Sequence, residues 1–209
     1  MFKSLYVLSS VLLTSIVISS MPHSTSYAQV GISGFRSISR GSYGSIRGSL
    51  RLPQQIKVSR YGYASFYFNL GNNCGAGISY GKKGGTDGQW YTFMNCGTNR
   101  GDSGTPIVLQ PINTIELSYD GVRQVTLFVN GRRVQSAMTR LSPSSVSMVH
   151  AYYDEPRGTE KTYYDSAAFE GVECNYSRSF CNFSSPESFG TARRLFYRST
   201  PTTLNTYMR

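Results

Sequence analysis

The chain has 209 residues, 21 of them basic and 11 acidic, and its formal net charge at pH 7 is +10. This length is sufficient for one domain with a sizeable core. The basic surface favours anionic partners, and arginine binds sulfate, phosphate and carboxylate groups as a planar fork. The basic residues are nevertheless scattered and match no nucleic-acid recognition motif, so nucleic acid is not an expected partner.

The first 28 residues have the three parts of a secretory signal peptide. Lys3 supplies a positive charge, Leu5 to Ile18 form an apolar segment, and Ser26-Tyr27-Ala28 places small residues at the cleavage positions. The apolar segment is shorter than the roughly 20 residues of a comfortable membrane span. We therefore expect a mature chain of residues 29–209 without a transmembrane span, secreted to the extracellular space or the periplasm. An uncleaved N-terminal anchor is the alternative.

The four cysteines are Cys74, Cys96, Cys174 and Cys181. An even number of cysteines in an exported chain indicates disulfides. Of the three possible connectivities we favour Cys74–Cys96 and Cys174–Cys181, because the members of each pair are close in sequence. The spacing contains no C-x₂-C pair, which disfavours a zinc site.

The mature chain begins with a segment rich in Ser, Gly and Arg, residues 29–45, which predicts either a flexible lead or a first irregular strand. From Ile46 onward, apolar and polar residues alternate, as is typical of half-buried strands. Polar, glycine-containing loops are expected at Gly81–Gly88 and Asn95–Thr105. The strands predicted in this first half are residues 46–52, 56–58, 64–70, 76–80 and 90–94.

Residues 112–135 predict a β-meander, because Asp120-Gly121 and Asn130-Gly131 are turn dipeptides between alternating segments. Further strands are predicted at 146–153, 162–164 and 167–172. The tail from about residue 185 has one apolar group, Leu195-Phe196-Tyr197, and either packs as a late strand or stays loose. No segment has a sustained 3.6-residue period. We therefore predict an all-β fold, an antiparallel two-sheet sandwich, formed by residues 46–209 as one domain.

Two neighbouring motifs resemble a known family. Thr114-Ile-Glu-Leu-Ser-Tyr-Asp-Gly121 followed by Val125-Thr-Leu-Phe-Val-Asn-Gly131 is similar to a strand pair of the concanavalin A-like lectin/glucanase superfamily, in particular its laminin-G-like members. Ala76-Gly-Ile-Ser-Tyr80 followed by Trp90-Tyr91 resembles a neighbouring strand pair. The resemblance covers roughly residues 64–135 and implies a jelly roll that often binds glycans and sometimes hydrolyses them. A fold alone does not determine function.

No complete catalytic set is present. The loop Gly101-Asp102-Ser103-Gly104 resembles the nucleophile loop of trypsin-like proteases, but no histidine precedes Ser103 in the mature chain, so the nucleophile lacks its base. The paired carboxylates of a glycosidase are also missing. Glu170 and Glu173 are three residues apart, which predicts opposite faces of a strand. The best enzymatic alternative is a polysaccharide lyase that uses His150 and one of four tyrosines. These tyrosines are Tyr152, Tyr153, Tyr163 and Tyr164.

The preferred hypothesis is a secreted lectin-like module that binds extracellular or cell-envelope glycan, or another anionic polymer. Aromatic rings can stack on sugars, and lysines can bind acidic substituents. A regular strand points Trp90 and Tyr91 to opposite faces, so one of them is expected to be core. The single mature histidine argues against a transition-metal site, and we expect no metal and no cofactor. The alternatives are a structural or adhesive protein and a polysaccharide-acting enzyme. The predicted ligand-binding residues are Tyr80, Lys82, Lys83, Trp90 and Tyr91.

Overall fold

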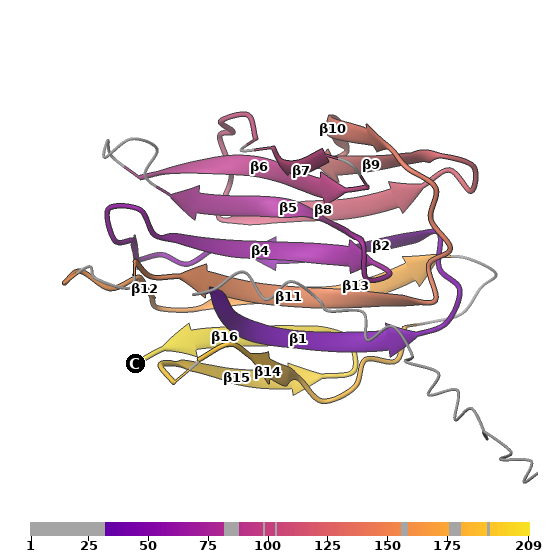
Figure 1. Cartoon of the computed structure of the whole chain (residues 1–209). Coiled ribbons are helices and arrows are strands. Elements are labelled where there is room, and N and C mark those ends of the chain that lie inside the picture. The colour runs from indigo at the N-terminus through magenta and orange to yellow at the C-terminus, as the bar shows by residue number, and fades with distance from the viewer. Residues whose placement is uncertain are drawn as a thin grey trace, which may run out of the picture.

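The structure is a computed structural model that describes residues 32–81, 88–97, 99–102, 104–155, 159–175, 181–191 and 193–209. The predicted signal peptide lies outside the described residues. Within those ranges every regular element is a β-strand and every strand pairing is antiparallel, which confirms the all-β sandwich prediction (Figure 1). No helix in the described part of the chain is long and apolar enough to cross a membrane.

Seven strands form the first sheet, here called sheet A (Figure 1). In spatial order they are β14 (Glu187–Phe189), β1 (Ile32–Arg40), β11 (Ser145–Tyr153), β4 (Tyr63–Leu70), β5 (Cys74–Gly81), β6 (Gln89–Cys96) and β7 (Asn99–Asp102). The strands from β11 to β6 are long and fully in register, so the centre of sheet A is regular.

Seven further strands form sheet B, and the strands β3 (Ile56–Lys57) and β12 (Tyr163–Tyr164) make a separate two-stranded sheet. The spatial order in sheet B is β10 (Arg132–Met138), β9 (Gln124–Val129), β8 (Ile112–Tyr119), β2 (Ser45–Arg51), β13 (Ala167–Asn175), β16 (Thr203–Met208) and β15 (Leu195–Thr200). The predicted meander is present as β8–β9–β10.

The two meander turns depend on side chains that satisfy backbone donors. Asp120 Oδ1 accepts hydrogen bonds from the N–H groups of Val122, Arg123 and Gln124 at 2.8 to 2.9 Å. These bonds lower the pKa of the Asp120 carboxyl below its usual value. Asn130 adopts a positive φ of 52° and accepts a hydrogen bond from the N–H of Thr114. Both residues therefore form turns, as their dipeptides predicted.

Residues 32–40 form strand β1, and residues 195–208 form the hairpin β15–β16, so both ends of the described chain contribute strands.

Strand β13 departs from simple alternation. The expectation that Glu170 and Glu173 face opposite ways is wrong. They pair with Ser49 and Arg47, which are on one face of β2, because a bulge interrupts β13 where Gly171 has a φ of 58°.

The inner faces of the two sheets pack into one core. Phe68 of sheet A stacks on Phe169 of sheet B with ring centroids 4.3 Å apart. The core also contains a polar bridge: His150 Nδ1 lies 2.6 Å from Thr206 Oγ1, which lies 2.7 Å from the Tyr164 hydroxyl. All three side chains are fully buried. The fully buried apolar side chains include Phe66, Leu70, Ile78 and Met148 of sheet A and Ile46, Leu50, Ile115, Leu117 and Leu127 of sheet B.

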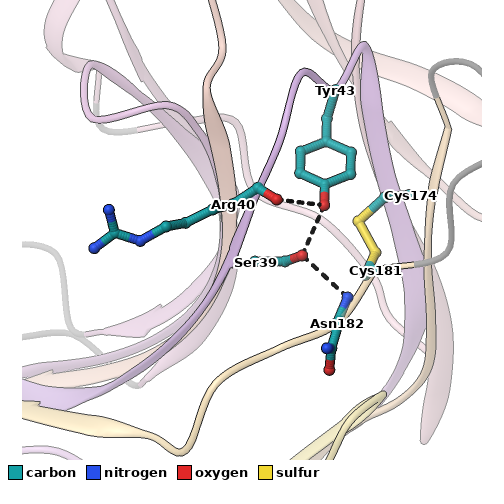
Figure 2. Close-up of a disulfide and its surroundings, with 6 residues drawn as sticks. All are labelled: Ser39, Arg40, Tyr43, Cys174, Cys181 and Asn182. Atoms are coloured by element: carbon teal, nitrogen blue, oxygen red, sulfur yellow. Dashed lines mark hydrogen bonds between the residues drawn. A yellow bond between two sulfur atoms is a disulfide. The ribbon is translucent and has the colours of Figure 1, made fainter.

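Both predicted disulfides are confirmed. Cys74 and Cys96 are directly opposite in the β5–β6 ladder. Figure 2 shows the second bridge beside a polar contact that fixes the segment after Cys181 to β1. Ser39 Oγ accepts the Asn182 N–H at 3.0 Å and lies 2.8 Å from the Tyr43 hydroxyl. The bridge and these bonds together close one side of the sandwich.

Candidate functional site

The outer face of sheet A, turned away from the core, carries a group of partly exposed aromatic rings. We call it the tyrosine face and define it by Tyr63, Tyr67, Tyr91, Phe93 and Tyr153. Residues two apart in a strand share a face, and the core takes the alternate set of each strand. The ladders therefore place these five rings together on the outside.

A strip of small residues crosses the middle of the tyrosine face at right angles to the strands. The strip consists of Gly34, Ala151, Ser65 and Ser79, which are successive register partners from β1 to β5. Ser65 Oγ donates a hydrogen bond to Ser79 Oγ at 2.9 Å. Tyr91 follows in register at the β6 end of the strip.

Aromatic rings stand on both sides of this strip. On one side Tyr63 and Tyr153 are directly opposite in register and stack, with ring centroids 5.6 Å apart and an interplanar angle of 22°. On the other side Tyr67 meets Phe93 edge to face at 5.3 Å. Such pairs hold their rings in fixed orientations, which reduces the entropy cost of binding a ligand.

Glycines in β5 allow the rings to lie close to the sheet. A Cβ at Gly77 would lie 2.4 Å from the Phe66 carbonyl oxygen and 2.6 Å from Cα and Cβ of Tyr67. A Cβ at Gly75 would lie 2.4 Å from Asn69 Oδ1 and 3.4 Å from the Tyr67 ring. Both positions therefore leave no room for a side chain beside β4. Polar groups continue beside them, where Asn69 Nδ2 donates a hydrogen bond to Ser147 Oγ at 3.0 Å.

Two tyrosine hydroxyls on this face, those of Tyr63 and Tyr67, are neutral hydrogen-bonding groups. Burial raises the pKa of Tyr67 to about 12, although the nearby Arg36 guanidinium acts in the opposite direction. Burial also raises the pKa of Tyr63 above its usual value. Neither phenol has the lowered pKa that a tyrosine base needs at neutral pH.

Carboxylates are scarce on the tyrosine face. Among the side chains described there, Glu187 of β14 is the one carboxylate, and it pairs with Arg36 at 3.5 Å. Asp154 lies just beyond β11. Its Oδ2 forms a salt bridge with Arg194 Nη2 at 2.5 Å, and its Oδ1 accepts a hydrogen bond from the Thr162 N–H at 2.6 Å. No group of three or more His, Cys, Asp or Glu residues among the described side chains could hold a metal ion.

The structure divides the five residues predicted from the sequence. Tyr80 and Trp90 point to the inner face, where their rings are 5.1 Å apart and Trp90 packs against Phe66 and the core. Tyr91 points to the outer face, as alternation predicted. Lys82 and Lys83 lie outside the described residues.

The residues proposed for a lyase do not gather at a surface. His150 is fully buried, and burial lowers its pKa to about 3. Tyr164 is fully buried and Tyr152 nearly so, whereas Tyr163 is exposed on the small sheet and Tyr153 belongs to the tyrosine face. The loop residue Ser103 lies outside the described residues.

The sequence contains a pattern that indicates the tyrosine face, but the many aromatic residues of β4 made it hard to recognise. Tyr63, Ser65, Tyr67 and Asn69 alternate with the core residues of β4, and Gly75, Gly77 and Ser79 alternate with those of β5. A ring-rich row beside a glycine-rich row on the same face indicates rings that lie over glycines.

No family model matches the chain, and no curated protein matches it. Among solved structures, the chain is similar to Scytalido-glutamic peptidase with a peptide-based transition state analogue, at a TM-score of 0.59, 8% identity and coverage of 87% of this chain and 99% of that one. It is also similar to SCP-B, a member of the eqolisin family of peptidases in a complex with the tripeptide Ala-Ile-His, at a TM-score of 0.53, 10% identity and the same coverages. The Bacillus licheniformis β-glucanase matches at a TM-score of 0.38, with 12% identity over 83% of this chain and 70% of that one. At these identities the likeness shows a shared fold alone, and the predicted antiparallel two-sheet sandwich is confirmed.

Proposed function

We propose that the mature chain is a secreted binding protein that holds an extracellular or cell-envelope glycan on the tyrosine face. The observation that carries the proposal is the strip of small residues between the Tyr63–Tyr153 stack and the Tyr67–Phe93 pair. Two disulfides and the signal-peptide-like N-terminus support secretion.

The chemistry of the face suits a sugar chain. The apolar C–H face of a pyranose stacks on an aromatic plane, and its hydroxyls need donors and acceptors at the edge of that plane. The partly exposed Ser79 provides such a group between the rings, Asn69 provides one just beyond Tyr67, and the phenol hydroxyls provide more. A sugar ring placed over the strip would contact an aromatic ring on either side.

Part of the site predicted from the sequence keeps a role in this proposal. Tyr91 borders the strip, and Lys82 and Lys83 follow Gly81, which pairs with Tyr63 at the end of the face. These lysines would serve a glycan with acidic substituents. Tyr80 and Trp90 would support the face from below by holding β5 and β6 together.

The scarcity of carboxylates favours binding over catalysis. Glycoside hydrolysis by the usual routes needs two carboxyl groups a few ångströms apart. The one carboxylate described on the tyrosine face is in an ion pair at an edge strand. A strand-borne pair of acids is present elsewhere, since Glu170 and Glu173 share the outer face of sheet B, but Glu170 is paired with Arg51.

An extended peptide is the second candidate ligand. Two solved structures that share the fold over their whole length hold a peptide-based transition state analogue and the tripeptide Ala-Ile-His. Tyrosine-rich surfaces bind peptides as well as sugars, because tyrosine combines a large ring with a hydroxyl. The same face would be used, so one experiment can compare both ligands.

The test is titration of the purified mature protein against a panel of neutral and acidic glycans and a panel of unstructured peptides, with heat release or intrinsic fluorescence as the readout. Tyr153→Ala and Tyr91→Ala should each weaken glycan binding about tenfold or more, because each removes one stacking ring. Tyr163→Ala is the matched control, since that tyrosine is 40% exposed but lies on the small sheet.

Glycan binding that survives both substitutions, or that falls equally in the control, would contradict the tyrosine face as the site. Binding to peptides but to no glycan would replace the first candidate with the second. An intact fold that binds neither would favour the structural or adhesive alternative. Release of reducing ends or unsaturated products would show that the protein is an enzyme.

A further inference from the structure

A second aromatic group lies on the opposite side of the sandwich, on the C-terminal hairpin β15–β16. Phe196 and Tyr207 are directly opposite in register and stack, with centroids 5.7 Å apart and an interplanar angle of 21°. Both point to the outer face of sheet B, because Leu204, Thr206 and Met208 take the alternate, buried positions.

Two arginines lie over this ring pair. The Arg198 guanidinium carbon is 6.0 Å from the Tyr207 centroid, and that of Arg209 is 5.3 Å from Tyr207 and 5.6 Å from Phe196. Both arginines are exposed. Neither forms a salt bridge with any carboxylate among the described residues.

Two carboxylates of the adjacent part of sheet B have partners of their own. Glu170 pairs with Arg51, and Asp165 Oδ1 accepts the N–H of Ser166 at 2.7 Å. A polar pair also borders the rings, since Ser166 Oγ donates to Asn205 Oδ1 at 3.0 Å and Asn205 is the register partner of Arg198. The hairpin therefore presents two exposed guanidinium groups that form no salt bridge among the described residues.

We infer that this surface, Phe196, Arg198, Tyr207 and Arg209, binds the anionic groups of a sulfated or carboxylated polysaccharide. Arginine forms bidentate hydrogen bonds with sulfate and carboxylate. Contact with the rings restricts each guanidinium before the ligand arrives, which lowers the entropy cost of binding. The 40% exposed ring of Phe196 adds an apolar plane against which a sugar can pack.

The position of the hairpin supports a long polymer as the ligand. β15 is an edge strand of sheet B, and its residues from Phe196 to Thr200 are all exposed. A polysaccharide could therefore extend past the ring pair on the side of this exposed edge strand. This site is separate from the tyrosine face, which lies on the other sheet. Its proposed ligand differs from that of the tyrosine face in requiring anionic groups.

The test uses the mature protein with dextran sulfate and polygalacturonate as anionic probes and unmodified dextran as the neutral probe. The double substitution Arg198→Gln/Arg209→Gln should weaken dextran sulfate binding about tenfold or more, because it removes two sets of charge-assisted hydrogen bonds. Arg132→Gln/Arg133→Gln is the matched control. It removes the same charge from two exposed arginines on β10, the opposite edge strand of sheet B, and should change affinity less than about threefold.

Phe196→Leu separates stacking from charge. It keeps an apolar group and should weaken binding to both anionic polymers while leaving the net charge unchanged. Binding through the tyrosine face, assayed with a neutral glycan, should be the same in all three variants, so the two proposals can fail independently.

Equal loss of affinity in the two double variants would show that binding depends on overall charge and would overturn the site. Unchanged affinity in Arg198→Gln/Arg209→Gln would overturn it as well. Binding of vesicles containing phosphatidylglycerol, or of single-stranded DNA, without binding of dextran sulfate would overturn the polysaccharide assignment. Self-association of Arg198→Gln/Arg209→Gln with full affinity for dextran sulfate would show that the arginines protect the strand edge instead.

Discussion

The outer faces of the two sheets are both exposed to solvent, yet they are built from different residues. The central strands of sheet B carry charges of both signs: Arg47 lies in register between Glu116 and Glu173, and Arg51 pairs with Glu170. The central strands of sheet A carry tyrosines, serines and glycines. Alternating charges are sufficient to keep a sheet face soluble. The tyrosine face therefore has a composition that solubility does not require, which is the reason for placing the ligand there.

Removing the two disulfides should give the largest changes in the free energy of unfolding, and comparing them tests how the two sheets differ in stability. The bridge between Cys74 and Cys96 closes a longer loop in sheet A than Cys174 and Cys181 close beside sheet B, with sequence separations of 22 and 7. Removing each pair by serine substitution should lower the free energy of unfolding by about 3.4 and about 2.5 kcal/mol in the chain-entropy account. Urea unfolding of both double variants measures the difference, and a larger loss from the shorter loop would contradict it.

A pair of glycines on β5 tests whether the tyrosine face needs close packing over the sheet. Gly77→Ala should lower the free energy of unfolding by about 1–3 kcal/mol, because its Cβ would lie 2.4 Å from the Phe66 carbonyl oxygen and 2.6 Å from Cα and Cβ of Tyr67. Gly81→Ala is the control on the same strand and face, where the nearest atoms would be 3.5 Å away. It should leave stability unchanged or raise it by up to about 1 kcal/mol. Equal effects of the two substitutions would mean that the close approach of β4 does not require a glycine at position 77.

The buried His150 should make the stability of the whole sandwich depend on pH. Burial lowers the pKa of His150 from 6.5 in the unfolded chain to about 3 in the folded one, so the folded state disfavours the protonated form. The stability that depends on a neutral His150 is fully present above pH 6.5 and is lost progressively as the pH falls toward 3. We expect a loss of about 2 kcal/mol between pH 8 and pH 5.

Groups from both sheets surround this ring and explain why no charge offsets its burial. Thr206, Phe66 and Phe169 contact it, and none of them is charged. Since His150 is the only histidine after the predicted signal peptide, His150→Asn should remove the dependence of stability on pH between 8 and 5. A wild-type protein equally stable at pH 8 and pH 5 would contradict the burial of a neutral imidazole.

Alternation and turn chemistry were sufficient to predict much of the fold from the sequence. The meander was predictable because Asp120-Gly121 and Asn130-Gly131 determine both the turns and the register of the strands that they join. The bulge at Gly171 was not, because a glycine in a strand does not reveal whether the partner strand will skip a residue. That single bulge moved Glu173 onto the same face as Glu170.

The candidate site was predicted less well, because it depends on which strands pair with each other in sheet A. Trp90 and Tyr91 are adjacent in sequence, and alternation correctly separated them, but nothing local indicates which strand lies on the far side of β4. The tyrosine face arises because β11 pairs with β4, which brings Tyr153 opposite Tyr63 across a separation of 90 residues. Contacts of that range depend on sheet order, which the residues of one strand do not encode.

The smallest predicted effect concerns the ion pairs of the two outer faces. Arg36 pairs with Glu187 on sheet A at 3.5 Å, and Arg51 pairs with Glu170 on sheet B. The four side chains are between 39% and 60% exposed, so solvent screens both pairs. Arg36→Gln and Arg51→Gln should each lower the free energy of unfolding by less than about 1 kcal/mol.

Arg36 should contribute even less than its geometry suggests, because its buried Nε–H has no acceptor in the described structure. Glutamine at this position removes that unsatisfied donor together with the charge, and the two changes oppose each other. Thermal unfolding at low and high salt measures both variants, and the small loss should shrink further at high salt. A loss above about 2 kcal/mol for Arg36→Gln alone would show that this arginine supports the tyrosine face by more than its ion pair, for example through the packing of its aliphatic stem.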